Sequence, residues 1–398
     1  MRSHSIAKRI ALAAAAVVLL LAACVFIMWR SEIAAFMSIE QVRGRDDAHQ
    51  DGSVYTMHVS GGFYLDDFVE QGGVSSDSEL ISFVTGKITK GLIPMEISES
   101  EIACSAFTAV TADGDRLFAR NYDMDKTNTC IVYTDASPGR HASVSTVDLQ
   151  FLGIDPESDM TGFMEKVNCL AAPYAPLDGV NDAGVSCAIF MSYQGAETVP
   201  TDQDTGKPDI TSTTLLRLIL DYADDLDEAV EIAQSYDLHD SAGTSYHYMV
   251  ADSSGRSAIL EYVAGTDATD NDGAARTLVV TYNDGDGHIG EREGAADYQW
   301  ITNFIIQPGY YEDPAERKGY DRYEKLCEEL GAAGGVVGDE AAAMDILASV
   351  GRRSWNNDDS NSCTVHSVVY NLTDRTAMWI PNEHYGDESA VFTLSASD

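Results

Sequence analysis

Residues 101 to 125 read EIACSAFTAVTADGDRLFARNYDMD and hold the most informative pattern in the chain. Small or apolar residues alternate with polar ones on both sides of Asp113-Gly114, which predicts a β-hairpin that turns at this pair. With a two-residue loop, Cys104 is expected opposite Asp123, and Arg120 lies near the same end of the hairpin. A thiol, a carboxylate and a guanidinium are therefore predicted to meet at the open end of two strands.

Cys104 begins its strand, and two interpretations of that position compete. A cysteine in a strand is most often a buried, inert core residue. Arg120 and Asp123, however, are charged residues on the partner strand, and burying them is costly unless they form a structural ion pair or serve a function. The three residues together favour a chemical site.

The rest of the chain alternates blocks of strands with pairs of helices. Such blocks predict an α+β fold in which two sheets lie face to face and helices cover their outer faces, a four-layer α/β/β/α sandwich. No internal repeat or Pro/Gly-rich linker interrupts residues 53–398, so these residues are expected to form one domain. A strand and a turn are expected at 53–73, hairpins at 177–193, 246–263 and 364–381, and a further strand within 276–287. Helices are expected at 75–92, 211–240 (two helices or a kinked one), 319–333 and 338–351.

The N-terminus resembles a membrane anchor. Arg2, Lys8 and Arg9 precede 20 uncharged residues, Ile10 to Trp29, and about 20 apolar residues suffice to span a bilayer. Residues 1–30 are therefore predicted to be a transmembrane segment, and the positive-inside rule places everything after it outside the cytoplasm. Residues 31–52 are polar without periodicity and are expected to be a stalk.

A second interpretation of the N-terminus is a lipoprotein signal. The sequence LAAC, Leu21 to Cys24, is then the cleavage box, and Cys24 becomes an acylated N-terminus. Val25 to Trp29 remain apolar, which favours the uncleaved anchor. In both interpretations the body of the protein is extracytoplasmic and tethered to the cell membrane.

The net charge of the chain argues against several classes of binding partner. The chain has 64 acidic and 25 basic residues and a formal net charge of -39. Such a chain is not expected to bind nucleic acid, or anionic lipid surfaces through its body. Much of the acid lies in short clusters such as TDQDTGKPD, which are expected to be solvated loops.

No cofactor or metal is expected. The seven cysteines are widely spaced without a CxxC pair, and the nine histidines show no HExxH spacing. The segment 282–293 has part of the spacing of a calcium loop, but Tyr282 occupies the position of the first ligand. His247 and His366 lie in predicted strands and are expected to be core residues or to act behind a site.

Seven segments, in this order along the chain, resemble one family of enzymes: CSAF, FARNYDMD, DGVNDAGVSCAI, YHYMVADSSGRSAILEY, VVTYND, GYDRYEKL and TVHSVVYNLTDRTAMW. The family is that of the N-terminal-nucleophile hydrolases of linear amides, which groups bile salt (choloylglycine) hydrolase and penicillin V acylase with acyltransferase-like and acid-ceramidase-like relatives. The resemblance implies the same α/β/β/α sandwich.

The resemblance also implies how Cys104 would act. In this family the cysteine is the first residue of the mature catalytic chain, and its own α-amino group is the general base for its thiol. Because Cys104 lies inside the chain, the Ala103–Cys104 bond would have to be cleaved, by the thiol itself. Residues 53–103 would then be an upstream segment, and 104–398 the catalytic chain.

Further site residues follow from the resemblance. Asp123 would orient the α-amine, Arg120 would lie beside the thiolate, and Arg322 would organise the surroundings of the nucleophile. Asn181 would be an oxyanion donor. The second such asparagine follows a threonine in the family, and Asn283, in Thr281-Tyr282-Asn283, is the expected equivalent.

Each of these residues also has a local explanation. Asn181 and Asn283 are suited to turns, and Arg322 could pair with Asp321 or Glu324 on a helix surface. The prediction is a membrane-tethered hydrolase of small N-acyl amides of the bile salt, penicillin V or lipid amide kind. Its alternatives are an acyltransferase that uses the same site, and a non-catalytic anchored binding protein.

Overall fold

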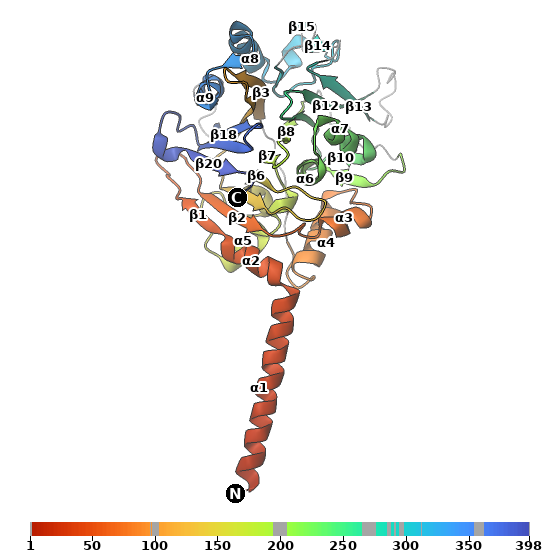
Figure 1. The fold of residues 1–398 in the computed structure, drawn as a ribbon, viewed down its shortest axis with the longest axis vertical. Helices are drawn as coiled ribbons and strands as arrows, with labels where there is room; N and C mark the ends of the chain where they lie inside the picture. The colour runs from red at the N-terminus through yellow and green to blue at the C-terminus, as the bar shows by residue number, and fades with distance from the viewer. Residues whose placement is uncertain are drawn as a thin grey trace.

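The computed structural model describes residues 2–95, 97, 103–193, 205–264, 276–284, 288–289, 292–293, 298–311, 313–353 and 362–397. Two large β-sheets with helices on both sides make up the body of the protein, and a long helix, α1 (Arg2–Met28), projects from it (Figure 1). The mixed α+β class predicted from the sequence is confirmed.

The first sheet has nine strands. All neighbouring strands run antiparallel except β2 and β5, which are parallel. The order across the sheet is β1 (Glu40–Arg43), β2 (Val54–Val59), β5 (Thr129–Thr134), β6 (Ser143–Asp148), β7 (Asp178–Asn181), β8 (Ser186–Met191), β11 (Tyr246–Ala251), β12 (Ser257–Ala264) and β13 (Arg276–Tyr282).

The second sheet contains the hairpin with which the sequence analysis began. Its strands run in the order β16 (Trp300–Ile301), β3 (Ala103–Thr111), β4 (Arg116–Asp125), β18 (Ser362–Asn371), β19 (Thr376–Pro381) and β20 (Phe392–Ser395), and β17 (Val336–Val337) pairs in parallel with the far end of β3. Two small two-stranded sheets lie outside it: β9 (Asp209–Thr211) with β10 (Asp237–His239), and β14 (His288–Ile289) with β15 (Arg292–Glu293).

Helices cover the outer face of each sheet. On the first sheet, α6 (Ser212–Tyr222) packs on β7 and β8, and α7 (Leu226–Ser235) packs on α6 and β11. On the second, α8 (Tyr320–Ala333) packs on β3 and β16, and α9 (Glu340–Ser349) on β4 and β18. Side chains alternate between the two faces of β8, and each face packs against a different layer. The Cys187 thiol points to α6, 3.9 Å from the Leu216 carbonyl oxygen, whereas the Phe190 ring points to the second sheet, 5.4 Å from the Arg120 guanidinium.

The remaining helices lie nearer α1. They are α2 (Arg30–Ser38), α3 (Leu65–Glu70), α4 (Asp77–Ile88) and α5 (Phe163–Cys169). Within α1, the window Ala11–Met28 has a mean hydropathy of 2.9 and is fully exposed. Among the described residues it is the single helix that is long and apolar enough to cross a membrane.

The irregular stalk expected at 31–52 is not observed. These residues contain most of α2 and all of β1, which extends the first sheet by pairing with β2. Ala35 and Ile39 are buried, so packing against the domain stabilises this segment. A helix of nine residues has too few turns to show apolar periodicity in the sequence.

Strands β5 and β6 were also not predicted, because nearly all of their residues are buried and the alternation of apolar and polar residues is lost.

The hairpin of β3 and β4 has a different register from the one predicted. Its loop has three residues, Ala112 to Gly114, because the Thr111 N–H donates to the Asp115 carbonyl at 2.8 Å and Gly114 takes a positive φ of 100°. Cys104 therefore lies opposite Tyr122, and Asp123 lies opposite Ala103. Since side chains alternate, the Cys104 thiol points between the two sheets, and the Asp123 carboxylate points towards the helical side.

Polar side chains join the two sheets in the core. The Tyr122 hydroxyl of β4 donates to Asp148 at the end of β6 at 2.7 Å, and Thr127 and the Gln150 N–H donate to the same carboxylate. Burial raises the pKa of Asp148 to about 6, although these three donors oppose the rise. The folded protein therefore holds a proton on Asp148 more tightly than the unfolded chain does.

We expect this carboxyl to make stability depend on pH. The ordinary pKa is 3.8, so the free energy of unfolding should fall as pH rises from about 4 to about 6, by about 3 kcal/mol in total. The variant Asp148→Asn should lack that fall, whatever constant offset it adds. Urea unfolding of the detergent-solubilised full chain across this pH range measures both curves. Asp345→Asn, an exposed carboxyl on α9, is the control, and parallel curves for wild type and Asp148→Asn would contradict the prediction.

Candidate active site

Three side chains contact three different atoms of Cys104, the cysteine of β3. Arg120 Nη2 lies 3.3 Å from the thiol sulfur. The Cys104 N–H donates to Asn303 Oδ1 at 2.9 Å, and its carbonyl oxygen accepts from Arg322 Nη1 at 3.2 Å. Cys104 has no exposed surface. The position of Cys104 is thus fixed through its backbone as well as its side chain.

The Arg120 guanidinium is held by groups from both sheets. It forms an ion pair with Asp178 of β7 and donates to the Ile189 carbonyl of β8 at 2.8 Å. The same Asp178 accepts from His366 at 2.8 Å and from Tyr370 at 2.6 Å. Burial acts to raise the pKa of Asp178, but His366 and Arg120 outweigh it and hold this pKa well below its usual range. A charged Asp178 therefore keeps Arg120 aimed at the sulfur.

The Cys104 thiol is not activated in the intact chain. Burial raises its pKa to about 11, even though the nearby Arg120 charge lowers it. At neutral pH the sulfur is therefore protonated, and Arg120 alone does not make it a thiolate. Repeated turnover of a substrate by this thiol would therefore require a base.

Asp123 and Arg322 form the side of the site that faces α8. Arg322 Nη1 lies 2.6 Å from Asp123 Oδ2, and its Nη2 donates to Asn303 Oδ1 at 2.9 Å. Thr364 of β18 donates to Asp123 Oδ1 at 2.7 Å. Burial raises the pKa of Asp123, while Arg322 and Thr364 oppose it. Arg322 is thus a buried bridge between Asp123, Asn303 and the Cys104 carbonyl, not a surface cation paired with Asp321 or Glu324.

Asn303 belongs to the site and was missed in the sequence. It follows β16, and its Nδ2 donates to the Met191 carbonyl at the end of β8 at 2.9 Å. A signal for it existed, because Thr302-Asn303 is itself a Thr-Asn pair. The assignment of Asn283 did not take this pair into account.

A buried pair behind the site holds the segment that contains Asn303. His247 of β11 lies 2.9 Å from the Thr302 carbonyl through Nε2, and 3.3 Å from Glu261 of β12 through Nδ1. Glu261 in turn accepts from the Ile306 N–H and the Gln307 side chain, both at 2.8 Å. The backbone on both sides of Asn303 is therefore fixed to the first sheet.

The structure does not bring Asn283 to Cys104. Its Oδ1 accepts from the Ser257 N–H at 2.9 Å and its Nδ2 donates to the Gly255 carbonyl at 3.0 Å, so it ties β13 to the turn before β12. This corrects the assignment made from the sequence. The turn explains Asn283 fully, because both polar atoms of its side chain are used there.

Asn181 likewise forms hydrogen bonds within its own turn. Its Oδ1 accepts from the Val185 N–H at 2.8 Å, and its Nδ2 donates to the Ala223 carbonyl at the end of α6 at 2.8 Å. The side chain thus points to the helical face of the first sheet, away from the thiol. Of the six residues predicted for the site, four surround one point: Cys104, Arg120, Asp123 and Arg322.

The described part of the chain contains no group of three or more His, Cys, Asp or Glu residues arranged to hold a metal ion.

The chain is similar to several solved structures. A conjugated bile acid hydrolase variant from Clostridium perfringens is 14% identical, with 74% of this chain and 94% of that chain covered and a TM-score of 0.47. Penicillin V acylase from Agrobacterium tumefaciens is 17% identical, covering 70% and 83%, with a TM-score of 0.44. A Caenorhabditis elegans ortholog of N-acylethanolamine-hydrolyzing acid amidase is 15% identical, covering 68% and 93%, with a TM-score of 0.40. No curated protein matches the chain.

A family model gives the more direct result. The model described as linear amide C-N hydrolases, choloylglycine hydrolase family, matches residues 104–268, so the match begins at Cys104 itself. Over residues 104–268, this protein is therefore similar to the choloylglycine hydrolase family of linear amide C-N hydrolases.

Proposed function

We propose that this protein hydrolyses N-acyl amides with Cys104 as an N-terminal nucleophile, after cleaving its own Ala103–Cys104 bond. The observation that supports this most directly is the coincidence of two features at one residue. The family match begins at Cys104, and Cys104 is also the residue whose nitrogen, carbonyl and sulfur are each contacted by a buried polar side chain.

Processing would supply the base that the intact site lacks. The Cys104 sulfur attacks the Ala103 carbonyl, and its proton passes to the Cys104 nitrogen as the C–N bond breaks. Water then hydrolyses the thioester, leaving a carboxylate on Ala103 and a free α-amine on Cys104. A free α-amine has a pKa of about 7.7 to 8, far nearer neutrality than the buried thiol at about 11.

The processed site would then act on an amide in two steps. The α-amine takes the thiol proton, Arg120 stabilises the resulting thiolate, and the thiolate sulfur then attacks the substrate carbonyl. The resulting α-ammonium gives its proton to the departing amine, which leaves an acyl-thioester. Water activated by the α-amine hydrolyses this thioester and releases the acid. Asn303, which already binds the Cys104 nitrogen, would orient the α-amine, and Asp123 would act through Arg322.

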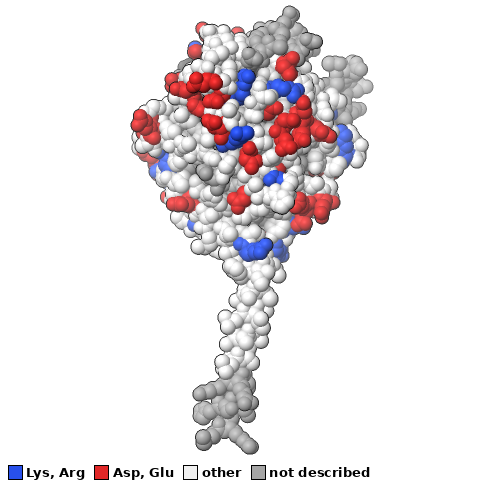
Figure 2. Space-filling model, in the orientation of Figure 1, with Lys and Arg blue, Asp and Glu red and all other residues white. Residues whose placement is uncertain are grey.

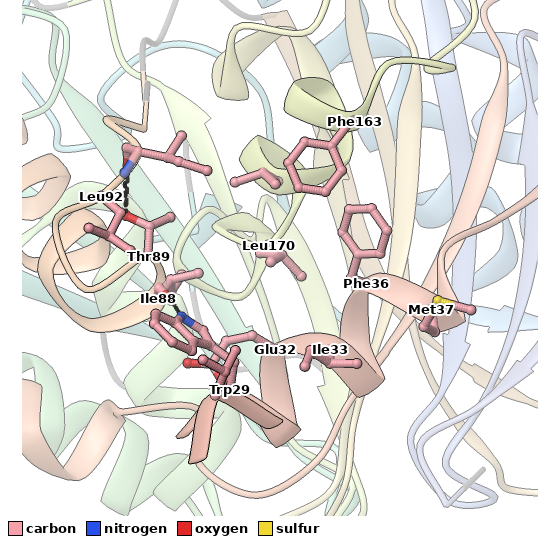
Figure 3. Close-up of a pocket in the computed structure, with 13 residues that line it drawn as sticks. Trp29, Glu32, Ile33, Phe36, Met37, Ile88, Thr89, Leu92, Phe163 and Leu170 are labelled. Atoms are coloured by element: carbon pink, nitrogen blue, oxygen red, sulfur yellow. Dashed lines mark hydrogen bonds between the residues drawn. The ribbon is translucent and has the colours of Figure 1, made fainter. Parts of the chain in front are cut away.

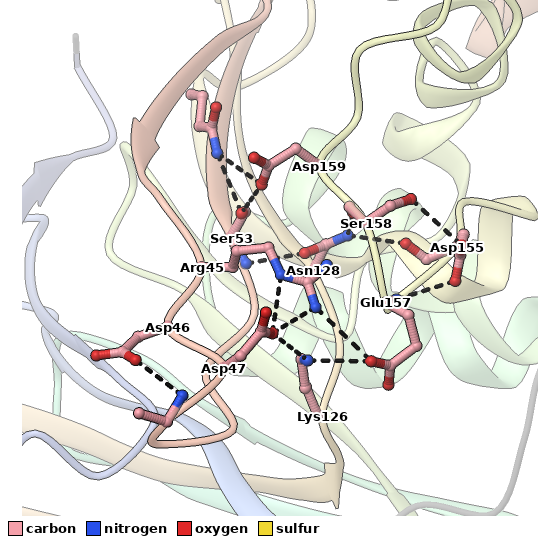
Figure 4. Close-up of polar contacts among 12 residues, drawn as sticks. Arg45, Asp46, Asp47, Ser53, Lys126, Asn128, Asp155, Glu157, Ser158 and Asp159 are labelled. Carbon is pink, nitrogen blue, oxygen red and sulfur yellow. Dashed lines mark hydrogen bonds and ion pairs between the residues drawn. The ribbon is translucent and has the colours of Figure 1, made fainter.

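The upstream segment would stay bound after cleavage. Its strand β2 lies between β1 and β5 inside the first sheet. Ser53 donates its N–H to Asn128 at 2.8 Å and its hydroxyl to Asp159, while Asp47 forms an ion pair with Lys126 at 2.9 Å (Figure 4). Because these contacts join residues on opposite sides of the cleavage site, the products would remain one non-covalent complex.

Helix α1 would anchor this complex, with the N-terminus in the cytoplasm and the catalytic chain outside. Its apolar window and the basic residues before it support this orientation. Bile salt conjugates, penicillin V and N-acyl amides of lipids are the substrates to screen.

Cys104→Ala should abolish processing. Intact-mass analysis of the wild-type full chain should show two fragments, the second beginning at Cys104, that elute together in gel filtration. Cys187→Ala, another buried strand cysteine that instead faces α6, is the matched control and should still be cut. An uncut wild-type chain, or a cut Cys104→Ala chain, would disprove the proposed nucleophile.

Asn303→Ala should reduce processing and amide hydrolysis by about 100-fold, because the Cys104 nitrogen loses the group that orients it. For comparison, the loss of one oxyanion donor costs about 100-fold to 1,000-fold. Asn283→Ala removes a buried asparagine of the same size that serves only a turn, and it should lower stability while leaving the rate per folded molecule unchanged. The two rates, measured at equal folded fractions, distinguish the assignments. A larger loss of rate in Asn283→Ala than in Asn303→Ala would mean that Asn283, and not Asn303, acts at the site.

His247→Phe should act through Asn303, because His247 holds the Thr302 carbonyl and does not touch Cys104 in the structure. We expect about a tenfold slower processing in the otherwise wild-type chain and little further loss in an Asn303→Ala background. A double-mutant cycle of processing rates measures this coupling. Independent, additive losses would mean that His247 has only a structural role.

A further inference from the structure

An apolar surface lies at the foot of the domain, where α1 leaves it. It is formed by α2, by the turn after α4 at residues 88–93, and by α5, and we call it the foot. These segments surround a pocket of about 300 Å³ (Figure 3). Its walls include Trp29, Ile33, Phe36, Leu92, Phe163 and Leu170.

The pocket is apolar despite one acidic residue in its wall. Glu32 is 3% exposed, and its carboxylate is satisfied by the Tyr64 hydroxyl and by the Lys90 ammonium at 3.2 Å. An apolar pocket of this size with its one charge already neutralised suits a hydrocarbon chain, and no polar group in it calls for a polar ligand.

The rim of the pocket is unusually exposed. Met37 is 75% exposed, Leu92 74% and Phe163 64%. Outside α1, the described chain exposes seven large apolar side chains, of which five lie at the foot: Ile33, Met37, Leu92, Phe163 and Met164. Singly exposed apolar residues are ordinary, but such a cluster marks an interaction surface.

The foot is fixed relative to the end of α1. The Trp29 indole N–H donates to the Ile88 carbonyl at the end of α4 at 3.0 Å, and the Glu32–Lys90 ion pair joins α2 to the same region. α1 leaves the domain directly at this surface (Figure 1). If α1 spans a bilayer, Trp29 and the foot therefore lie at its outer interface, where tryptophan is favoured.

Charge agrees with a phospholipid surface. Lys and Arg side chains gather where the domain meets α1, whereas acidic side chains gather higher on the same face (Figure 2). Arg30 and Lys166 belong to the foot and suit lipid phosphates. The net charge of -39 disfavours a strongly anionic membrane, so zwitterionic phospholipid is the better match.

We propose that the foot is seated in the outer leaflet of a zwitterionic phospholipid bilayer and that its pocket receives a lipid acyl chain. This rests on the membrane insertion of α1 in the proposed function, but not on the chemistry of Cys104. The foot would thus be a second membrane contact, which sets the orientation of the catalytic domain against the bilayer.

The test adds one tryptophan at a time to the full chain in phosphatidylcholine vesicles with brominated acyl chains. Phe163→Trp reports on the foot, Val18→Trp on α1, and Val336→Trp on an exposed apolar position in β17, which pairs with the far end of β3 from Cys104. The quenching of the added emission, relative to the parent chain, should be strong for Phe163→Trp and Val18→Trp and absent for Val336→Trp.

Quenching of Val18→Trp without quenching of Phe163→Trp would overturn the seating of the foot and leave the anchor intact. Quenching of Phe163→Trp alone would support the seating and overturn the anchor, and quenching of neither would overturn both. If a second copy of the chain covers the foot, Phe163→Trp emission will be shielded from the bromines, which also overturns the proposal.

The pocket has its own readout. Phosphatidylcholine with a diazirine near the end of one acyl chain should label Leu170, which is 5% exposed and lines the pocket. Labelling confined to Met37 and Phe163 at the rim would show that lipid contacts the foot without entering the pocket.

Discussion

The structure depends on one buried cation between its two sheets. Arg120 extends from β4 of the second sheet to the first sheet. Its Nη1 pairs with Asp178, and its Nη2 contacts both the Ile189 carbonyl and the Cys104 sulfur. Removing one partner of a buried ion pair typically costs about 3–5 kcal/mol. Burying Arg120 is therefore favourable only when both sheets supply its partners. The buried guanidinium then fixes the Cys104 thiol at the interface of the two sheets.

Much of the site could be read from one hairpin, because strand alternation places residues near in sequence on known faces. Cys104, Arg120 and Asp123 were found in this way, and the register was wrong by one residue because Gly114 closes a three-residue loop. Asn303 and Asn283 could not be separated by local pattern. Only long-range contacts show that one reaches Cys104 across 199 residues of sequence while the other serves the turn before β12.

The strands and helices that were missed share a physical cause. Strands β5 and β6 are covered on both faces, so their sequences show no alternation. Helix α2 is held by packing on β2 and by the Glu32–Lys90 pair, and neither contact is visible in nine residues of sequence. By contrast, α6 and α7 follow each other closely, so the helical spacing of apolar residues recurs over both of them, and α8 has 14 residues. These longer amphipathic stretches located the helices in the sequence.

The proposed processing is coupled to folding through the order of the chain. The Cys104 nitrogen is bound by Asn303 and its carbonyl by Arg322, both about two hundred residues downstream. His366 and Tyr370, which hydrogen-bond to Asp178 and favour its charged form, lie even further along the chain. A chain that lacks its C-terminal part therefore lacks the surroundings of Cys104. Self-cleavage would therefore be confined to molecules in which the upstream segment is already locked into the first sheet, so that cutting the chain does not release the anchor.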